Sequence, residues 1–288
     1  MSARNQTPVK LGILAGGGFL PKAVIESCQQ NKRPYHVIAF KHQTPASLVT
    51  GTPHHWVRLG AAGKTVGILH DEGVQELVMA GSIKRPTLAQ LRPDLWAMKF
   101  FMKTGAATMG DDGILRTLIT ALEENEGFRV IGAEQFVSHL LIKQGLYSDR
   151  TPDKNDENDI KIAIQAALKL GAGDYGQAVV VRDGAVIGEE DSDGTDAMLE
   201  KLAIDKNQPP SGVLVKLPKP GQERRADLPA IGPETITKAA QAGLSGIAME
   251  AGGGFLLEQQ EALNRLQKSS LFLIGLDQNA AQVKSADD

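Results

Sequence analysis

The sequence predicts an α/β protein, with an open, mostly parallel sheet in its first half and a mixed sheet with hairpins in its second. Short apolar runs suited to buried parallel strands alternate with helical patterns through residues 10–136. A glycine turn directly follows the first of these runs. In the second half, the segment GQAVVVRDGAVIGEE (176–190) has Asp-Gly at its centre, which strongly indicates a β-hairpin.

The composition is that of an ordinary globular chain of 288 residues with a formal net charge of -3. This charge argues against a general nucleic-acid binder and against a polybasic membrane-surface protein. Cys28 is the only cysteine, so no internal disulfide can form and a reducing compartment is expected. The N-terminus lacks a signal-peptide core, and no apolar run approaches the roughly 18 residues of a membrane span. We therefore expect a soluble, cytoplasmic protein.

The opening elements are predicted to be a strand over 10–14, a glycine turn AGGGFL (15–20), a helix beginning at Pro21 and a strand over 35–40. This order is typical of a Rossmann-like sheet, in which the N–H groups of Gly16, Gly17 and Gly18 can approach a phosphate. A packing turn without a ligand explains the same residues equally well. The dinucleotide fingerprint is incomplete, because proline replaces its third glycine and no acid ends the second strand. This argues against a nicotinamide cofactor.

The first half is predicted to continue with a helix within 62–74, a strand over 76–81, an amphipathic helix over 110–127 and a strand over 128–136. Asp111 and Asp112 begin the amphipathic helix, where carboxylates interact favourably with the helix dipole. The stretch 94–103 is apolar on nearly all sides. It indicates core packing, with a wall for acyl chains as the alternative.

The second half is predicted to contain an exposed polar loop over 147–158 and a helix over 159–170, followed by the hairpin. A helix from 194 has Thr195 as its N-cap, and a strand over 212–217 and a helix over 232–243 come next. AGGGFL recurs at 251–256 without a proline or cap to start a helix. We interpret this second copy as the turn of a hairpin, with a helix and a strand over 270–277 after it.

Two charged segments in the second half carry the functional signal. The first, GEEDSDGTD (188–196), gathers five carboxylates, among them Glu190, Asp193 and Asp196. Hard carboxylate oxygens are suited to Mg²⁺ or Mn²⁺, although a solvated acidic loop would have the same composition. The sequence therefore offers a candidate metal site here.

The second charged segment, KLPKPGQERRADLPAIG (216–232), crowds Lys216, Lys219, Arg224 and Arg225 around Asp227 between prolines. A rigid loop of this kind can clamp phosphate oxygens, and its aspartate can hold a metal or orient a water. The alternative is a basic connector in which the aspartate pairs with an arginine. The two segments together predict metal-assisted chemistry on a phosphate ester or anhydride. The six histidines lack metal-ligand spacing, and we interpret each as a surface or packed residue.

Five segments resemble the LpxI family of UDP-2,3-diacylglucosamine pyrophosphatases, in the family's order across about residues 10–277. They are LGILAGGGFLP, AGSIKRP, GDDGILR, GQAVVVRDGAVIGEEDSDGTDAML and GVLVKLPKPGQERRADLPAIGPETI. The resemblance implies Mg²⁺-dependent hydrolysis of UDP-2,3-diacylglucosamine to UMP and 2,3-diacylglucosamine 1-phosphate (lipid X) in lipid A biosynthesis. It also implies two domains with the substrate between them. We place a Rossmann-like domain at 1–134, a catalytic α/β domain at 135–278 and a flexible tail at 279–288.

The resemblance assigns the family's essential aspartate to Asp227, within RADLP. The residues that we predict to hold Mg²⁺ are Asp227, Asp196 and Glu190. The residues that we predict to be catalytic are Asp227, Lys216, Lys219 and Arg225. The residues that we predict to bind substrate are Gly16, Gly17, Gly18, Arg85, Gln222 and Thr195. Asp193 stands where the family often has glutamate, so no metal role is assigned to it.

The expected partner is a lipid-linked UDP-sugar, met through transient contact with the cytoplasmic face of the inner membrane. Nucleic acid is not expected, and the sequence leaves a homodimer open. Two rival interpretations remain: a non-catalytic UDP-sugar-binding protein, and a transferase that passes a group from a UDP-sugar to an acceptor. Release of UMP without an added acceptor separates hydrolysis from both.

Overall fold

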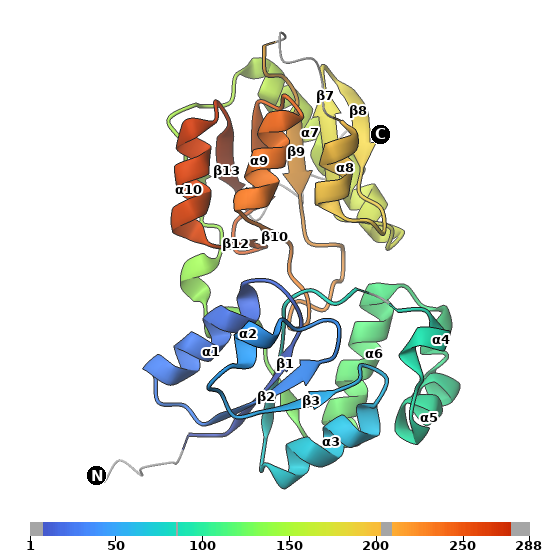
Figure 1. Ribbon diagram of the computed structural model, residues 1–288. Coiled ribbons are helices and arrows are strands. Elements are labelled where there is room, and N and C mark those ends of the chain that lie inside the picture. The colour runs from blue at the N-terminus through green and yellow to red at the C-terminus, as the bar shows by residue number, and fades with distance from the viewer. Residues whose placement is uncertain (1–7, 85, 203–208, 278–288) are drawn as a thin grey trace, which may run out of the picture. The chain divides into compact units, whose positions relative to one another are not determined.

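A computed structural model describes residues 8–84, 86–202 and 209–277 (Figure 1). These residues form two compact units. The first unit contains residues 8–138 together with the short segment 223–227, and the second contains 139–222 and 228–277. The segment 223–227 therefore belongs to the first unit by its contacts, although it lies late in the sequence.

The first unit contains a five-stranded parallel sheet with the strand order β3-β2-β1-β4-β5. Its strands are β1 (Leu11–Ala15), β2 (Tyr35–Phe40), β3 (His54–Val57), β4 (Glu76–Ala80) and β5 (Arg129–Val130). Its helices are α1 (Leu20–Gln30), α2 (Ala46–Val49), α3 (Ala62–Asp71), α4 (Leu88–Leu91), α5 (Leu95–Thr104) and α6 (Asp111–Glu124). The order reverses between β1 and β4, which is where open α/β sheets bind ligands. The Rossmann-like prediction is confirmed.

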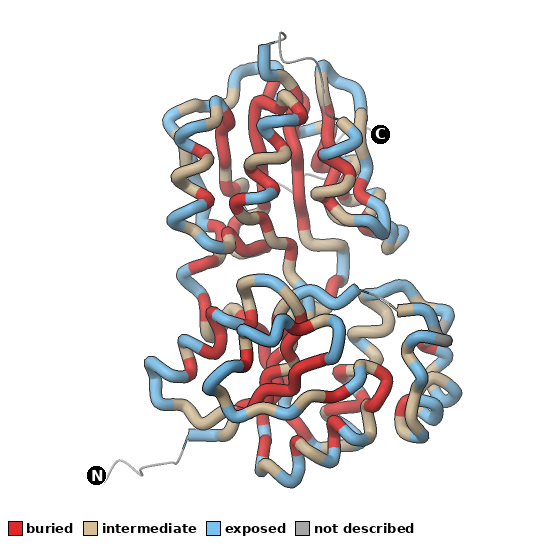
Figure 2. The backbone as a smooth tube through the Cα atoms, viewed as in Figure 1, coloured by how far each residue is buried: buried red, intermediate tan, exposed pale blue. Residues whose placement is uncertain are grey.

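The core of the first unit follows from the apolar periodicity of its helices and strands. Leu69 of α3 and Ile119 of α6 pack with Ile38 and Leu77 of the sheet, and all four side chains are fully buried. Figure 2 shows buried residues, in red, along the strands of this sheet. Each such side chain stabilises the fold by about 1.5–3 kcal/mol. The predicted amphipathic helix is therefore confirmed as α6.

The second unit is built on a six-stranded mixed sheet with the order β6-β13-β11-β9-β7-β8. Its strands are β6 (Gly145–Leu146), β7 (Ala178–Arg182), β8 (Ala185–Glu189), β9 (Val213–Lys216), β11 (Gly246–Glu250) and β13 (Phe272–Leu276). A separate parallel pair consists of β10 (Ala230–Ile231) and β12 (Phe255–Leu256). The β7–β8 hairpin, with Asp183-Gly184 at its turn, is confirmed.

Helices cover both faces of this sheet (Figure 1). They are α7 (Lys154–Ala172), α8 (Thr195–Lys201), α9 (Pro233–Gln241) and α10 (Gln259–Lys268). Val179 belongs to the apolar cluster that contains residues of α7 on one face, while Val180 belongs to the cluster that contains residues of α8, α9 and α10 on the opposite face. Burial of both faces explains why the strands read as continuous apolar runs rather than as alternating patterns.

The structure corrects the hairpin predicted around the second AGGGFL. β11 pairs with β9 and β13, whereas β12 pairs with β10 in a different sheet. The glycine segment instead forms backbone hydrogen bonds with Ile142, which is distant in the sequence. Gly252 N donates to Ile142 O at 2.7 Å, and Ile142 N donates to Gly254 O at 2.9 Å. Local pattern could not reveal these partners, because they lie more than 100 residues away in the sequence.

Three boundaries also differ from the prediction. The polar stretch 147–158 already contains the start of α7, because Asp153 and Asp156 form a capping box there. Gly194, not Thr195, is the N-cap of α8. The strand predicted over 128–136 is limited to Arg129–Val130 and is followed by a 3-10 turn.

The helix predicted to pack in the core, now α5, is largely exposed. Ala97 is its buried residue, whereas Leu95, Met98 and Met102 have 76%, 46% and 82% of their surface exposed. These three side chains follow the i, i+3, i+7 spacing of a single helix face. Core packing is therefore wrong for this face, although Ala97 is buried and Trp96 packs against the core on another side of the helix.

Candidate active site

The glycine turn after β1 is fixed by backbone contacts to the loop after β4. Gly16 N donates to Ala80 O, and Gly17 N donates to Ser82 O, each at 2.8 Å. A Cβ at Gly16 would lie 2.4 Å from Ser82 O, so no other residue fits without moving the backbone. Gly18 has a φ of 85°, which favours glycine. Two of the three predicted phosphate-binding glycines thus use their N–H groups inside the protein, and their contact with substrate remains a prediction.

The loops after β2 and β4 are joined beside this turn. Gln43 Nε2 donates to Lys84 O at 3.0 Å, and Lys84 N donates to Gln43 Oε1 at 2.9 Å. The loops at the carboxyl ends of β1, β2 and β4 are therefore joined by hydrogen bonds, at the edge of the sheet where the strand order reverses. Arg85, predicted to bind substrate, follows directly but lies outside the described residues.

The segment Glu223 to Asp227 is held in the first unit by α6. Glu223 N donates to Asp112 Oδ1 and Arg225 Nη1 donates to Glu123 Oε1, each at 2.8 Å. Ala226 packs against the apolar core of this unit. The N–H of Asp227 donates to Glu223 O at 3.2 Å, so the backbone that carries the exposed Asp227 side chain is fixed.

The guanidinium of Arg225 is committed to carboxylates. Its Nε and Nη2 donate to Glu223 at 2.9 Å, in addition to the bond to Glu123. The bonds to Glu223 raise the pKa of Arg225 above its usual range, and they lower the pKa of Glu223. The arrangement shows how Arg225 positions the segment, while its predicted contact with phosphate remains untested.

A buried polar chain in the second unit links three predicted site residues: Glu190, Thr195 and Lys216. Lys216 Nζ donates to Thr195 Oγ1 at 2.7 Å, Thr195 Oγ1 donates to Glu190 Oε1, and Lys216 Nζ lies 3.7 Å from Glu190 Oε1. Each residue is at most 8% exposed. The backbone N–H of Gln177 donates to the other carboxylate oxygen, Glu190 Oε2, at 2.8 Å. Charges this deeply buried persist only when they are paired in this way.

The remaining predicted residues of the second unit lie on neighbouring loops and helices. Asp196 accepts a hydrogen bond from Thr235 and lies 3.6 Å from Lys238 Nζ. Lys219 Nζ donates to Asp174 at 2.6 Å. Its N–H donates to Gln222 Oε1, so the side chain of Gln222 closes a turn. The structure thus brings Glu190, Thr195 and Lys216 into contact and assigns Arg225 and Asp227 to the other unit.

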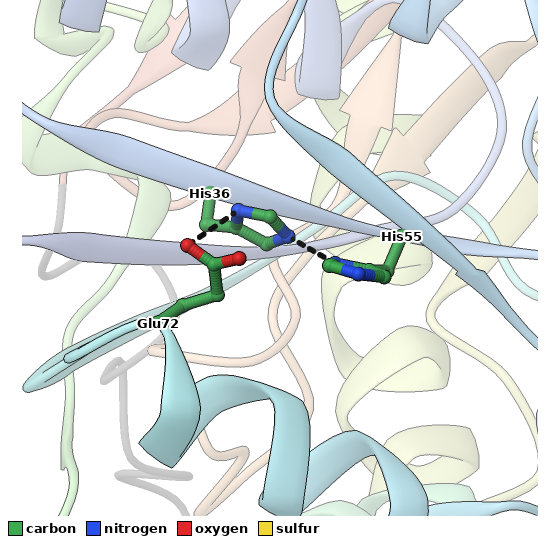
Figure 3. Close-up of side chains that lie close together, drawn as sticks. All are labelled: His36, His55 and Glu72. Carbon is green, nitrogen blue, oxygen red and sulfur yellow. Dashed lines mark hydrogen bonds and ion pairs between the residues drawn. The ribbon is translucent and has the colours of Figure 1, made fainter.

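A third cluster was not predicted from the sequence, since each histidine was interpreted as a surface or packed residue. His36 on β2 contacts His55 on β3, and Glu72 after α3 lies beside it (Figure 3). Burial lowers the pKa of His36, while the charge of Glu72 opposes that shift. The hydrogen bond from Lys10 is the main cause that lowers the pKa of Glu72. The spacing 36, 55, 72 has no recognisable motif, and only the strand pairing brings the first two together.

Comparison with known proteins identifies the family. The model of the LpxI N-terminal domain matches residues 10–140, and that of the LpxI C-terminal domain matches residues 143–274. The chain belongs to the LpxI family. One LpxI relative, the UDP-2,3-diacylglucosamine pyrophosphatase LpxI of Caulobacter vibrioides, is 35% identical over 275 residues, which are 93% of this chain and 98% of the relative.

A solved structure was also matched, at a much lower level. It is carboxyaminoimidazole ribonucleotide synthase from Asperigillus clavatus complexed with ATP, with 12% identity and a TM-score of 0.24, over 72% of this chain and 47% of that one. A score this low carries no argument about the fold or function of an LpxI protein. Within the part of the chain that the structure describes, no helix is long and apolar enough to cross a bilayer.

Proposed function

We propose that this protein hydrolyses the pyrophosphate of UDP-2,3-diacylglucosamine, producing UMP and 2,3-diacylglucosamine 1-phosphate for lipid A biosynthesis. The observation that carries the proposal is the relationship over nearly the whole of both chains to a UDP-2,3-diacylglucosamine pyrophosphatase. The buried cation of the second unit and the fixed aspartate of the first unit are consistent with this chemistry.

The positive charge that the reaction needs comes from Lys216 and Lys219. Lys216 ends β9, and its ammonium is held below the surface by Thr195 and Glu190. A partly desolvated ammonium stabilises developing phosphate charge more strongly than a solvated one, and it needs no reorganisation during the reaction. We assign Lys216 to transition-state stabilisation and Lys219 to binding of the substrate phosphates.

Asp227, with Asp196, is our proposed holder of Mg²⁺. Both side chains offer hard carboxylate oxygens, and that of Asp196 is 41% exposed, so the donor chemistry fits a magnesium ion. When bound, Mg²⁺ supplies positive charge to the phosphoryl oxygens. Both oxygens of Glu190 already accept hydrogen bonds, so a role of Glu190 as a third ligand would use its remaining lone pairs.

Asp227 also orients the attacking water in this mechanism. The water oxygen forms a new bond to one phosphorus, and the bridging P–O bond of the anhydride breaks. The bridging oxygen leaves with the other phosphate, and the proton of the water passes to solvent. We propose that the substrate binds between the two units, so that the residues of both contribute.

The exposed face of α5 supports a lipid-linked substrate. Its apolar residues Leu95, Met98 and Met102 are accompanied by the exposed cations Lys99 and Lys103. Apolar side chains flanked by lysines suit an interface with anionic lipid. We propose that this face makes transient contact with acyl chains or with the cytoplasmic surface of the inner membrane.

The test is release of UMP from UDP-2,3-diacylglucosamine with Mg²⁺, and again with EDTA. We expect turnover without an added acceptor and loss of turnover with EDTA. Asp227→Ala should lower kcat by about 100- to 1,000-fold, the usual cost of a lost stabilising group, while Asp191→Ala, an exposed control, should retain activity. Tight UDP-sugar binding without UMP release would instead support a binding protein, and dependence on an acceptor would support a transferase.

A further inference from the structure

Two histidines and a glutamate converge within the first unit, far in sequence from the charged segments discussed above. His36 is the second residue of β2, His55 is the second residue of β3, and Glu72 directly follows α3. His36 Nε2 lies 2.9 Å from His55 Nδ1, and His36 Nδ1 lies 3.4 Å from Glu72 Oε2. One ligand atom from each residue lies within 4.8 Å of the other two. Figure 3 shows His36 between its two partners.

The central imidazole is poorly satisfied as it stands. His36 is 3% exposed, and its Nδ1 atom has no hydrogen-bond partner although Glu72 is close. A buried polar atom without a partner is expensive, at about 1–3 kcal/mol. An ion bonded to this nitrogen would remove that cost, and Glu72 Oε2 lies beside it to share the ion.

We propose that His36, His55 and Glu72 bind a divalent transition-metal ion, with Zn²⁺ as the best match. Two imidazoles and one carboxylate form a ligand set that zinc accepts, with a water completing the fourth position. Mg²⁺ and Ca²⁺ are poor candidates here, because they prefer sets made of oxygen atoms. Among the described residues, these three side chains form the group of histidine, cysteine and carboxylate ligand atoms that lie close enough together to share one ion.

Lys10 tunes the site and provides a sharp test. Its Nζ donates to Glu72 Oε2 at 2.9 Å, so its charge competes with a cation for that carboxylate. The side chain of Lys10 is 28% exposed, which leaves its ammonium a path toward solvent when an ion binds. Removing this charge should therefore strengthen metal binding, whereas removing a ligand should weaken it.

The site is independent of the proposed hydrolysis. His36 and His55 lie near the amino ends of their strands, whereas the glycine turn lies at the carboxyl end of β1. The ion would connect the edge strand β3 to β2 and to the end of α3. Binding only to the folded state raises the free energy of unfolding, so the expected consequence is a more stable first unit.

The experiment is calorimetric titration of the chelator-stripped full-length protein with Zn²⁺, in excess Mg²⁺ so that sites made of oxygen ligands are filled. We expect one equivalent of Zn²⁺ to bind and to raise Tm. His55→Ala and Glu72→Gln should weaken binding at least ~10-fold, and Lys10→Met should strengthen it. His54→Ala is the matched control, since His54 is a neighbouring histidine bonded to Thr52 O. Co²⁺ should show a visible ligand-field band in the wild type and not in His55→Ala.

Two results would overturn the proposal. One is the absence of Zn²⁺ binding, which would leave the cluster as a hydrogen-bonded chain. The other is binding that survives in His55→Ala and Glu72→Gln, or that is lost equally in His54→Ala, because the ion would then lie elsewhere. Both variants change residues outside the buried core, and a Tm measured without metal confirms that they fold. UMP release measured in parallel keeps this result separate from the proposed function.

Discussion

The two units hold their predicted site residues by opposite means. In the second unit, Lys216, Thr195 and Glu190 form a chain that is almost wholly buried. In the first unit, Arg225 holds the segment 223–227 through ion pairs in which its side chain is 39% exposed. Burial makes a polar contact strong and costly to break, whereas solvent screens an exposed pair. The same residue types should therefore respond differently to substitution, salt and pH.

The largest effect is expected on breaking the buried chain. Lys216→Met keeps the length of the side chain but leaves Glu190 without its cation, and removing one partner of a buried pair costs about 3–5 kcal/mol. The proposed role of Lys216 adds a loss of activity. Urea unfolding and UMP release measure the two effects separately.

A second variant separates stability from catalysis. In Lys216→Met/Glu190→Gln the unpaired charge is gone, so we expect much of the lost stability to return while activity stays low. Lys201→Met is the matched control, because Lys201 pairs with Asp191 and Asp193 at the surface and its side chain is 61% exposed. A double variant as unstable as the single one would show that the buried pair is not the source of the loss.

A buried group in the first unit should also contribute to stability through its burial, and Cys28 provides the test. Cys28 is 1% exposed on α1, and burial raises the pKa of its thiol from 9.0 to about 11. Between these values the unfolded chain loses the thiol proton and the folded chain keeps it, so stability falls as pH rises from 9 to 11. The loss attributable to Cys28 is about 1 kcal/mol at pH 10, and none is expected below pH 8.

The measurement is urea unfolding at pH 7 and pH 10. Cys28→Ala should lose less stability than the wild type between these two pH values, whatever its cost at pH 7. Equal losses in both proteins would mean that the thiol is not protected by burial. A wild-type thiol that reacts quickly with a thiol reagent at pH 8 would lead to the same conclusion.

The two copies of AGGGFL show what the sequence could and could not predict. The first copy is followed by Pro21 near the start of α1, a local signal, and its role in the sheet was predictable. The second copy depends on Ile142, a partner that no local pattern identifies. The same limit applies to the site: Lys216 and Glu190 were predictable from residue type, but their contact through Thr195 was not. Return of the segment 223–227 to the first unit also depends on tertiary contacts with Asp112 and Glu123.

The smallest effect is expected at the exposed pair. Glu123→Gln removes the charge that Arg225 Nη1 contacts at 2.8 Å, but Glu223 remains as a second carboxylate partner. An exposed pair contributes about 0.2–1 kcal/mol, and salt weakens it further. We expect a small loss of stability that shrinks in high salt, and Glu124→Gln, an exposed neighbour on α6, should show none. The pair holds Arg225, which lies two residues before Asp227, so UMP release should also fall slightly. If Glu123→Gln lost as much stability as Lys216→Met, the contrast between the units would be wrong. Exposure to solvent would then not determine how much these ion pairs contribute to stability.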